Sequence, residues 1–451
     1  MRADVLNKEN VLETARQIRQ HLAASLPARQ GRRRAIDDET AEIEIVVDEI
    51  DASLASHGEN KSPKRRGFQP LGDGEHPPSA FMSRDAILSN VQSALEVVLD
   101  NPETGGKPPA TEGAREPTDT NEVPARDRRS RRVFDKFSVT DIGWISSLVA
   151  TGVTKFRSPR DFNPLPAATV ALPSKCRVIM VGDWGSGLPR AQSVAREMRK
   201  FVEDAKDSGL ACHVVHLGDV YYSGWEYEYK QRFLPYWPVL PSEKDRFGSW
   251  CLNGNHDMYS GGYGYFDYLL ADPRFARQEK SSFFRIATPK WQILGLDTAW
   301  DDDGLKDPQA AWVESMNSDG ARRTMILSHH QMFSAREPGD VGKVMRQKLS
   351  RTLEAGAIDA AIWGHEHRCM VFAPHNNVQY ARLIGHGGVP VYADKGEPPP
   401  PAVFQTSRTI STNPLEHWAL MGFAVFDFDD AEVNVLYVDE NGQIDKRETL
   451  R

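Results

Sequence analysis

The sequences KCRVIMVGDWG (residues 175–185) and ACHVVHLGDVYY (residues 211–222) each run from a short apolar segment into Gly-Asp. Three further apolar segments end in the same way: residues 250–252 precede Gly254-Asn255-His256-Asp257, residues 324–327 precede Ser328-His329-His330, and residues 360–363 precede Gly364-His365-Glu366-His367. Short, β-branched runs closed by glycine and followed by helical stretches predict parallel strands of an α/β sheet. Because the loops after such strands leave the same edge of the sheet, we expect their Asp, Asn, Tyr and His side chains to lie together.

These side chains are the ones that hard and borderline metal ions bind. Carboxylate oxygens, amide oxygens and imidazole nitrogens are suitable ligands, and one carboxylate can bridge two ions. Two ions about 3.5 to 4 Å apart polarise a phosphoryl group and supply a hydroxide nucleophile near neutral pH. A single Gly-Asp dipeptide carries little weight, but five motifs in this order predict a dinuclear metal site rather than unrelated turns.

The motif set resembles the calcineurin-like metallophosphoesterase superfamily, and within it the short-chain, tartrate-resistant type of purple acid phosphatase. The superfamily opens with Asp-x-His, but Gly185 stands here in place of that histidine. Tyr222, three residues after Asp219, gives the GD-x-x-Y pattern of the purple acid phosphatases. The resemblance covers about residues 175–390. It implies an α/β fold: a four-layer sandwich of two mixed β-sheets flanked by helices, with a helical and disordered N-terminal extension outside it.

The resemblance also implies the metal ligands. The first site would consist of Asp183, Tyr222 and His367, and the second of Asn255, His329 and His365, with Asp219 bridging the two ions. The implied cofactors are two metal ions, Fe3+ at the Tyr222 site and Fe2+, Zn2+ or Mn2+ at the second. A tyrosinate needs a strong Lewis acid, which fits a trivalent ion. Tyr221 is the alternative ligand, but in an extended stretch it would point to the opposite face from Tyr222.

Four more residues are candidates for catalysis or substrate binding. His256 resembles the general acid of the family, with Asp257 orienting its imidazole and raising its pKa; the alternative for His256 is a structural role beside the ligands. His330 is predicted to replace a second catalytic histidine that residues 333–339 lack. His386, in Gly385-His386-Gly387-Gly388, is predicted to lie on a substrate-facing loop. For His330 and His386 the alternative is a hydrogen-bonded loop histidine.

The predicted function is hydrolysis of phosphomonoesters by a metal-bound hydroxide, with His256 protonating the leaving group. The pair His329-His330 favours an alternative, a phosphodiesterase of cyclic nucleotides or similar diesters. Two further alternatives are a phosphoprotein phosphatase that recruits its substrate through the N-terminal region, and a binding protein that keeps the fold without turnover. The expected partners are a phosphorylated small-molecule or protein substrate and a protein bound by the N-terminal region.

Composition sets the remaining expectations. The chain has 451 residues, a formal charge of −8 and 40% hydrophobic residues, so a full core is possible and nucleic acid is not the expected partner. The four cysteines show no CxxC spacing and are predicted to be reduced core residues. The first residues show no apolar signal region and no run is long enough to cross a bilayer, so we expect a cytoplasmic protein without membrane association.

The chain is predicted to divide into four parts. Residues 1–100 are an N-terminal helical extension, 101–133 a disordered linker, 134–165 a connecting helix packed on the catalytic domain, and 166–451 the catalytic domain. In the extension, helices are expected over residues 10–26, 37–54 and 83–99, the last capped by Ser83. Near the C-terminus, alternating residues 422–428 and 432–438 predict a hairpin, and residues 391–414 a loop.

Overall fold

A computed structural model of the chain describes residues 8–25, 38–59, 82–100, 159–301, 303–318, 320–393, 396–413 and 416–451. These residues form two compact units, one holding the three N-terminal helices and the other holding residues 159–258 and 262–451. The predicted linker and most of the predicted connecting helix lie outside the described residues. Neither prediction is therefore tested.

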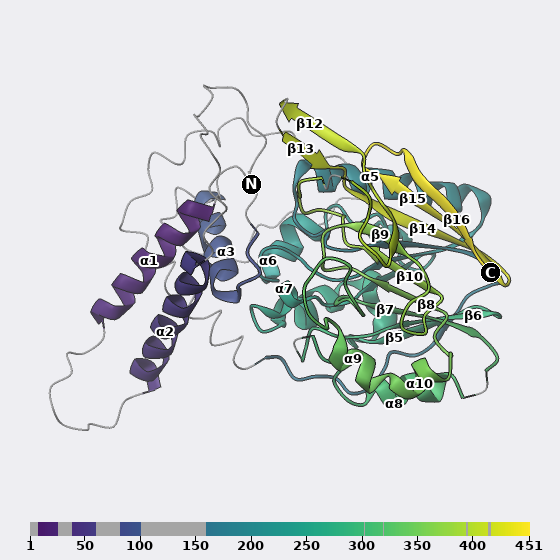
Figure 1. Ribbon diagram of the computed structural model, residues 1–451, viewed down its shortest axis with the longest axis horizontal. Coiled ribbons are helices and arrows are strands. Elements are labelled where there is room, and N and C mark those ends of the chain that lie inside the picture. Colours follow the sequence, from purple (N-terminus) through teal and green to yellow (C-terminus); the bar gives the residue numbers. More distant parts are fainter. Residues whose placement is uncertain are drawn as a thin grey trace. The chain divides into compact units, whose positions relative to one another are not determined.

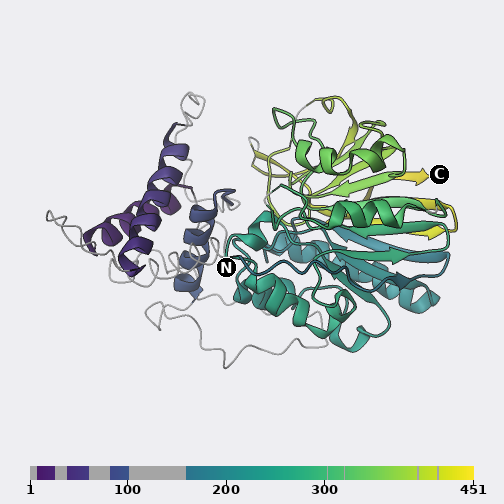
Figure 2. The same cartoon turned by 90° about the horizontal axis from the view of Figure 1, so that it is seen from below.

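The N-terminal unit contains α1 (Lys8–Ser25), α2 (Asp38–Glu59) and α3 (Ala86–Asp100), which pack on one another (Figure 2). Helix α1 buries Ile18 completely, and Arg19 forms an ion pair with Asp51 of α2 at 2.9 Å. The three helices lie close to the predicted positions. The predicted cap of α3 is wrong, because the side chain that accepts the N–H of Leu88 at 2.9 Å is that of Asp85. The Ser83 hydroxyl instead accepts the N–H of Asp85 itself.

The second unit is built on two mixed sheets (Figure 1). The eight-stranded sheet has the order β1-β5-β6-β7-β8-β10-β9-β11, and the six-stranded sheet the order β16-β15-β14-β2-β3-β4. The strands of the first are β1 (Val170–Ala171), β5 (Phe284–Ala287), β6 (Trp291–Gly295), β7 (Arg323–Ser328), β8 (Ala360–Trp363), β9 (Cys369–Phe372), β10 (Tyr380–Ile384) and β11 (Ala402–Gln405). Those of the second are β2 (Lys175–Val181), β3 (Ala211–His216), β4 (Gly248–Cys251), β14 (Gly422–Asp429), β15 (Glu432–Asp439) and β16 (Ile444–Leu450).

Helices and short helical turns connect these strands. The helices are α5 (Pro189–Ser208), α6 (Glu226–Glu228), α7 (Asn255–Met258), α8 (Gln309–Met316), α9 (Lys343–Lys348) and α10 (Ser350–Glu354). The turns are η4 (Tyr229–Phe233), η5 (Pro241–Glu243), η6 (Gly264–Tyr268), η7 (Leu269–Ala271) and η8 (Pro273–Gln278).

The core forms between the two sheets and on their outer faces. Between the sheets, Met180 and Val215 of the six-stranded sheet pack with Ile293 and Leu327 of the eight-stranded one. A second cluster buries the other face of the eight-stranded sheet under α8, α9 and α10. Helix α5 turns Val194, Met198 and Val202 inward onto the six-stranded sheet. This layering confirms the predicted fold of two mixed sheets flanked by helices.

The five predicted strand-and-loop motifs are present, but they do not share one sheet. Strands β2, β3 and β4 are parallel neighbours in the six-stranded sheet, whereas β7 and β8 are parallel neighbours in the eight-stranded one. The expectation of a single sheet edge is therefore wrong. The loops after these strands come together across the junction of the two sheets.

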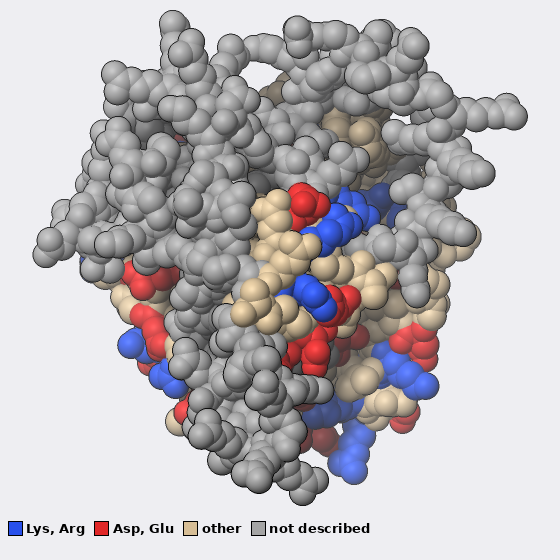
Figure 3. Space-filling model, turned by 90° about the vertical axis from the view of Figure 1, so that its left-hand side faces the viewer, with Lys and Arg blue, Asp and Glu red and all other residues tan. Residues whose placement is uncertain are grey.

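The C-terminal hairpin is confirmed, since β14 and β15 pair antiparallel along their whole length. The loop expected over residues 391–414 contains β11 and β12 (Thr409–Asn413), and β12 pairs with β13 (Glu416–Ala419). All four cysteines are free and buried. Where described residues reach the surface in Figure 3, basic and acidic side chains are intermixed. Within the described ranges, no helix combines the length and apolar character needed to cross a bilayer.

Candidate metal centre

The backbone of the ligand loops is unusual at four of the predicted ligands. Asp183, Asp219, His365 and His367 have φ angles of 56°, 75°, 72° and 49°. Residues with a Cβ rarely adopt this left-handed region, and such conformations persist where the surroundings fix them, often at functional sites. Hydrogen bonds join three of these loops: the Asp183 N–H donates to the Gly218 carbonyl at 3.0 Å, and the His365 N–H donates to Oδ2 of Asp183 at 2.8 Å.

A first group of ligand atoms surrounds the hydroxyl of Tyr221. This oxygen lies 3.1 Å from Oδ1 of Asp183, 3.1 Å from Oδ2 of Asp219 and 2.9 Å from Nε2 of His367. The His367 nitrogen is also 3.4 Å from Oδ1 of Asp183. Tyr221 and both carboxylates are almost completely buried. Two carboxylates, a phenol and an imidazole thus face one small volume.

Tyr222, the predicted ligand, is not in this group. The Cζ atom of Arg232 lies 5.2 Å from the centroid of the Tyr222 ring, and the Tyr222 carbonyl faces His256. The prediction excluded Tyr221 because adjacent side chains of an extended stretch point to opposite faces, but side chains two residues apart share a face, and Tyr221 lies on the side of Asp219. The chain also turns at residues 221–223, so Tyr222 is directed elsewhere.

A second group brings together Asn255, His329 and His365. Nε2 of His329 lies 3.0 Å from Oδ1 of Asn255 and 3.1 Å from Nδ1 of His365, and 3.0 Å separates that Nδ1 from the Asn255 oxygen. The other ring nitrogen of His329 lies 2.9 Å from the Leu217 carbonyl, which can only accept, so the hydrogen is on Nδ1. In the neutral ring Nε2 then has its lone pair directed at the group, the arrangement found in metal-binding histidines. Burial opposes the charged form, but Asp219 raises the pKa of His329 to about 9, so an ion bound here would take the place of the proton on Nε2.

Asp219 belongs to both groups. Its Oδ2 is 3.4 Å from Nε2 of His329 as well as 3.1 Å from the Tyr221 hydroxyl. Burial alone would raise the pKa of this carboxyl, but His329 and His256 outweigh it and lower the pKa well below its usual range. Burial, together with Asp183 and Asp219, raises the pKa of Tyr221 well above its ordinary value. This phenol would therefore ionise only beside a strong positive charge.

The donor set fits a pair of metal ions on two observations from the described residues. Ligand atoms of Asp183, Asp219 and His329 lie within 4.8 Å of one another, and so do those of His329, His330 and His365. All of these side chains are buried or nearly so, and the carboxylates and imidazoles present oxygen and nitrogen to the same volume. Borderline and hard ions prefer this mixture.

The imidazole of His256 lies at the edge of this volume. Its Nδ1 is 2.5 Å from the Tyr222 carbonyl and therefore carries a hydrogen, and its Nε2 is 4.0 Å from Oδ2 of Asp219. Burial lowers the pKa of His256, and the nearby Asp219 carboxylate offsets only part of this effect.

Asp257 was expected to orient this ring, but its carboxylate has other partners. It accepts the N–H groups of Asp219 at 2.8 Å and Gly254 at 2.6 Å and the hydroxyl of Tyr229. Burial raises the pKa of Asp257 to about 7. Asp257 therefore ties the second motif to the third. Tyr229 was not predicted, because its contact with Asp257 joins residues far apart in sequence.

His330 lies beside the second group. Its ring centroid is 4.8 Å from that of His365 and 5.0 Å from that of His329. Thr298, which was not singled out as a site residue, orients it, since Oγ1 lies 3.2 Å from Nδ1 and accepts the His330 N–H at 3.1 Å.

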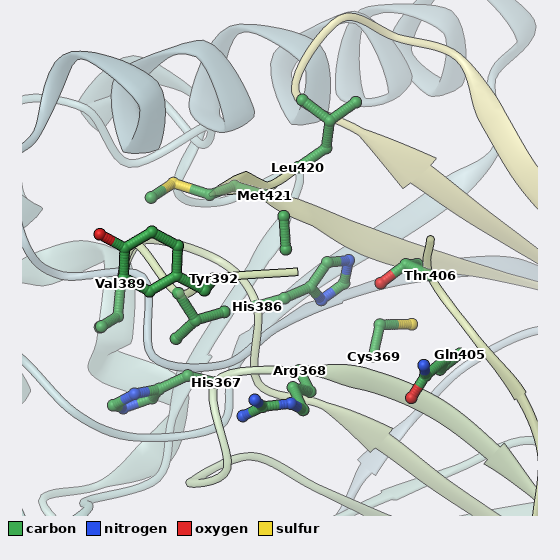
Figure 4. A pocket seen from close by; sticks show the side chains of 12 residues that line it. His367, Arg368, Cys369, His386, Val389, Tyr392, Gln405, Thr406, Leu420 and Met421 are labelled. Atoms are coloured by element: carbon green, nitrogen blue, oxygen red, sulfur yellow. The ribbon is translucent and has the colours of Figure 1, made fainter. Parts of the chain in front are cut away.

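His386 lies apart from both groups, in a pocket beside His367. Residues lining it include Cys369, Val389, Tyr392, Thr406 and Met421. In Figure 4 the side chains of His386 and His367 point in opposite directions. Burial lowers the pKa of His386 to about 3, so the ring is neutral, and its Nδ1 has no hydrogen-bond partner among the described residues.

Comparison with known proteins agrees with the motifs. Residues 176–369 match the family model for the calcineurin-like phosphoesterase, and this range contains all five motifs. No curated protein sequence matches the chain. Residues 176–369 therefore form a calcineurin-like phosphoesterase domain.

Solved structures similar to the chain include three that differ in description. GAP50, the anchor in the inner membrane complex of Plasmodium, aligns with a TM-score of 0.45 and 14% identity over 61% of this chain and 89% of that one. A predicted phosphoesterase of Streptococcus pneumoniae aligns with a TM-score of 0.28 and 12% identity over 61% and 97%. A cold-active protein-tyrosine phosphatase of a psychrophilic Shewanella aligns with a TM-score of 0.27 and 13% identity over 63% and 83%.

Proposed function

We propose that this domain is a dinuclear metal hydrolase of phosphomonoesters, similar to the purple acid phosphatases. The observation that carries the proposal is the shared carboxylate, because Oδ2 of Asp219 lies within 3.4 Å of Nε2 of His329 and within 3.1 Å of the Tyr221 hydroxyl. A carboxylate between two groups of ligand atoms is what a pair of neighbouring ions requires.

In this proposal Asp183, Tyr221, Asp219 and His367 hold one ion, and Asp219, Asn255, His329 and His365 hold the other. Tyr221 takes the role that the resemblance gave to Tyr222. Because its pKa is raised by burial and by two carboxylates, only a strong Lewis acid such as Fe3+ suits that site. Fe2+, Zn2+ or Mn2+ suits the second. When bound, such a pair polarises a phosphoryl oxygen and lowers the pKa of a water molecule.

His256 is the proposed general acid. With a hydrogen on Nδ1 donated to the Tyr222 carbonyl, Nε2 is the atom that faces the ligand groups. Burial lowers its pKa, but a bound phosphate dianion favours the charged imidazolium and would raise it again. The proton at Nε2 would then pass to the leaving alkoxide as the ester bond breaks.

The alternative, a phosphodiesterase, is favoured by one observation. His330 adds a third imidazole to the cluster of His329 and His365. Turnover of monoester and diester substrates distinguishes the two proposed activities.

The test is a panel of esters with the metal-loaded protein. We expect higher kcat/KM for 4-nitrophenyl phosphate and phosphoserine than for bis(4-nitrophenyl) phosphate and a cyclic nucleotide. Chelation by EDTA and the variant Asp219→Asn should both abolish turnover. Dominant turnover of diesters would replace the monoesterase proposal with the diesterase one, and metal binding without hydrolysis of any ester would favour a binding protein.

The N-terminal helices are the proposed site for a protein partner. Deletion of residues 1–130 should then leave turnover of 4-nitrophenyl phosphate unchanged and weaken only the binding of a partner. Loss of small-substrate turnover would instead assign these residues to the catalytic unit.

A further inference from the structure

The turn that carries Tyr221 has little support from strand pairing. It follows β3, and beyond the isolated bridge between Gly185 and Val220 no ladder continues among the described residues. The Tyr221 N–H donates to the Gly185 carbonyl at 3.1 Å, but the next four residues, 222–225, belong to neither sheet, and α6 begins at Glu226. Other contacts must therefore hold the phenol in place.

A buried carboxylate holds the backbone of this turn. The side chain of Glu228 is 0% exposed. Its Oε1 accepts the Tyr222 N–H at 2.5 Å, and its Oε2 accepts the N–H groups of Ser223 at 3.1 Å and Trp225 at 2.9 Å. One carboxylate thus satisfies three N–H groups directly after Tyr221, and hydrogen bonds to a charged acceptor are stronger than neutral ones.

A buried guanidinium holds the other side of the same turn. Nη1 of Arg232 donates to the Tyr221 carbonyl and lies 3.8 Å from Oε1 of Glu228, and the guanidinium covers the ring of Tyr222. The stem of Arg232 also lies against the first ligand loop, because a Cβ on Gly187 would meet its Cγ at 2.7 Å. Arg232 therefore contacts both the loop after β2 and the loop after β3.

We propose that Glu228 and Arg232 are positioning residues that hold the Tyr221 turn so that the phenolic oxygen reaches Asp183, Asp219 and His367. A buried ion pair is often no more stabilising than apolar residues of the same volume. Because both members of this pair bind backbone groups of the turn that carries a proposed ligand, we assign them a role in positioning that turn rather than in stability. The inference rests on the proposed metal centre. It predicts that loss of the pair loosens the turn and weakens metal binding, even where the fold persists.

The chain offers a matched control in a second buried pair. Arg199 donates to Glu243 at 2.5 and 2.9 Å, and Glu243 accepts the N–H of Leu240 at the start of η5, much as Glu228 does at α6. The Arg199–Glu243 pair joins α5 to η5 and contacts none of the proposed ligands. Its removal should cost stability alone.

The experiment compares Glu228→Gln/Arg232→Met with Glu243→Gln/Arg199→Met. Each double variant removes both charges, so no buried charge is left unpaired. Fe3+, supplied as its citrate complex, is titrated into metal-free protein, and hydrogen exchange is followed in peptides covering residues 218–232. We expect the first variant to bind Fe3+ about tenfold to a hundredfold more weakly than wild type, as for other residues that orient ligands, and to exchange faster in those peptides. The control should match wild type in both.

Unchanged Fe3+ affinity and unchanged exchange in the first variant would overturn the inference. Equal losses of affinity in both variants would also overturn it, because they would show a general effect of stability. Failure of the wild type to bind Fe3+ would instead reject the proposed metal centre, and the inference with it. If the first double variant does not fold, Glu228→Gln alone is compared with Glu243→Gln by the same two measurements.

Discussion

The phenolic oxygen of Tyr221 lies 3.1 Å from Oδ2 of Asp219, and only Val220 separates the two residues in sequence. Both side chains lie on the same side of the loop after β3, in which Asp219 has a φ of 75° and residues 221–223 form a turn. The proposed shared carboxylate and the proposed tyrosine ligand thus come from one loop, and its conformation decides which of two adjacent tyrosines is available to a metal.

The two tyrosines are therefore expected to differ in the iron-loaded protein. Tyr221→Phe should abolish a visible tyrosinate-to-iron absorption band, because the ligand oxygen is removed, whereas Tyr222→Phe should retain it. Absorption spectra of the two variants and wild type, at matched iron content, make the comparison. Loss of the band in Tyr222→Phe alone would restore Tyr222 as the ligand. Absence of a band in iron-bound wild type would remove tyrosinate from the centre and bring the diesterase alternative level with the monoesterase.

The role of His256 predicts a dependence on the leaving group. His256→Asn should lower kcat by about 10² to 10⁴ for an alkyl phosphate, whose alkoxide needs a proton, and much less for 4-nitrophenyl phosphate, whose leaving group does not. The measurement is kcat for a series of esters of rising leaving-group pKa. A uniform loss across the series would point to a structural role for His256, the alternative open from the sequence.

Features that depend on residues close together in the chain could be predicted from the sequence. The strands before the five motifs are apolar runs with polar ends, so both the strands and the ligand loops could be located from residues close together in the chain. The sequence could not show that β7 and β8 belong to a different sheet from β2, β3 and β4, because buried parallel strands look alike in sequence whichever sheet they join.

Features that depend on contacts between residues far apart in sequence, or on the exact backbone of a loop, could not be predicted either. The choice between Tyr221 and Tyr222 depended on the backbone of the loop after β3, including the positive φ angle at Asp219, which no residue pattern encodes at an aspartate. The partners of Asp257, including Tyr229, lie on loops that meet only in the folded chain. The sequence predicted Ser83 as the cap of α3, but the Asp85 carboxylate accepts the Leu88 N–H, and the Ser83 hydroxyl accepts the Asp85 N–H at 3.1 Å.

A buried histidine remote from the centre predicts a pH dependence of stability. His213 accepts the indole N–H of Trp250 at 2.9 Å, and burial, with a smaller contribution from Arg277, lowers its pKa from 6.5 to about 3. The folded state therefore binds this proton less tightly than the unfolded state. Its contribution to stability is complete above pH 6.5 and is lost as pH falls towards 3. Between pH 7 and pH 5 the loss should be about 2 kcal/mol.

The measurement is urea unfolding of the metal-free protein at pH 7 and pH 5. His213→Gln, which keeps an acceptor for Trp250 but does not titrate, should lose about 2 kcal/mol less than wild type over this interval. His417→Gln, on the exposed face of β13, is the control and should behave as wild type. If the free energy of unfolding depends on pH equally in His213→Gln and wild type, the pKa of His213 is not lowered in the folded state and the prediction is wrong.

The approach of Gly254 to Asp219 gives the last prediction. A Cβ at residue 254 would lie 2.1 Å from Oδ1 and 2.8 Å from the backbone nitrogen of Asp219, so Gly254→Ala must displace the shared carboxylate. Overpacking of this kind costs roughly 1–3 kcal/mol. Gly356→Ala is a suitable control: its Cβ would meet nothing within 4 Å, but its φ of 64° makes alanine unfavourable by roughly 1–2 kcal/mol. Both variants should therefore lose similar stability in thermal unfolding, while only Gly254→Ala loses Zn2+ affinity and phosphatase turnover. Normal Zn2+ binding by Gly254→Ala would mean that Asp219 can move without loss of the centre, which is incompatible with a carboxylate held between two ions.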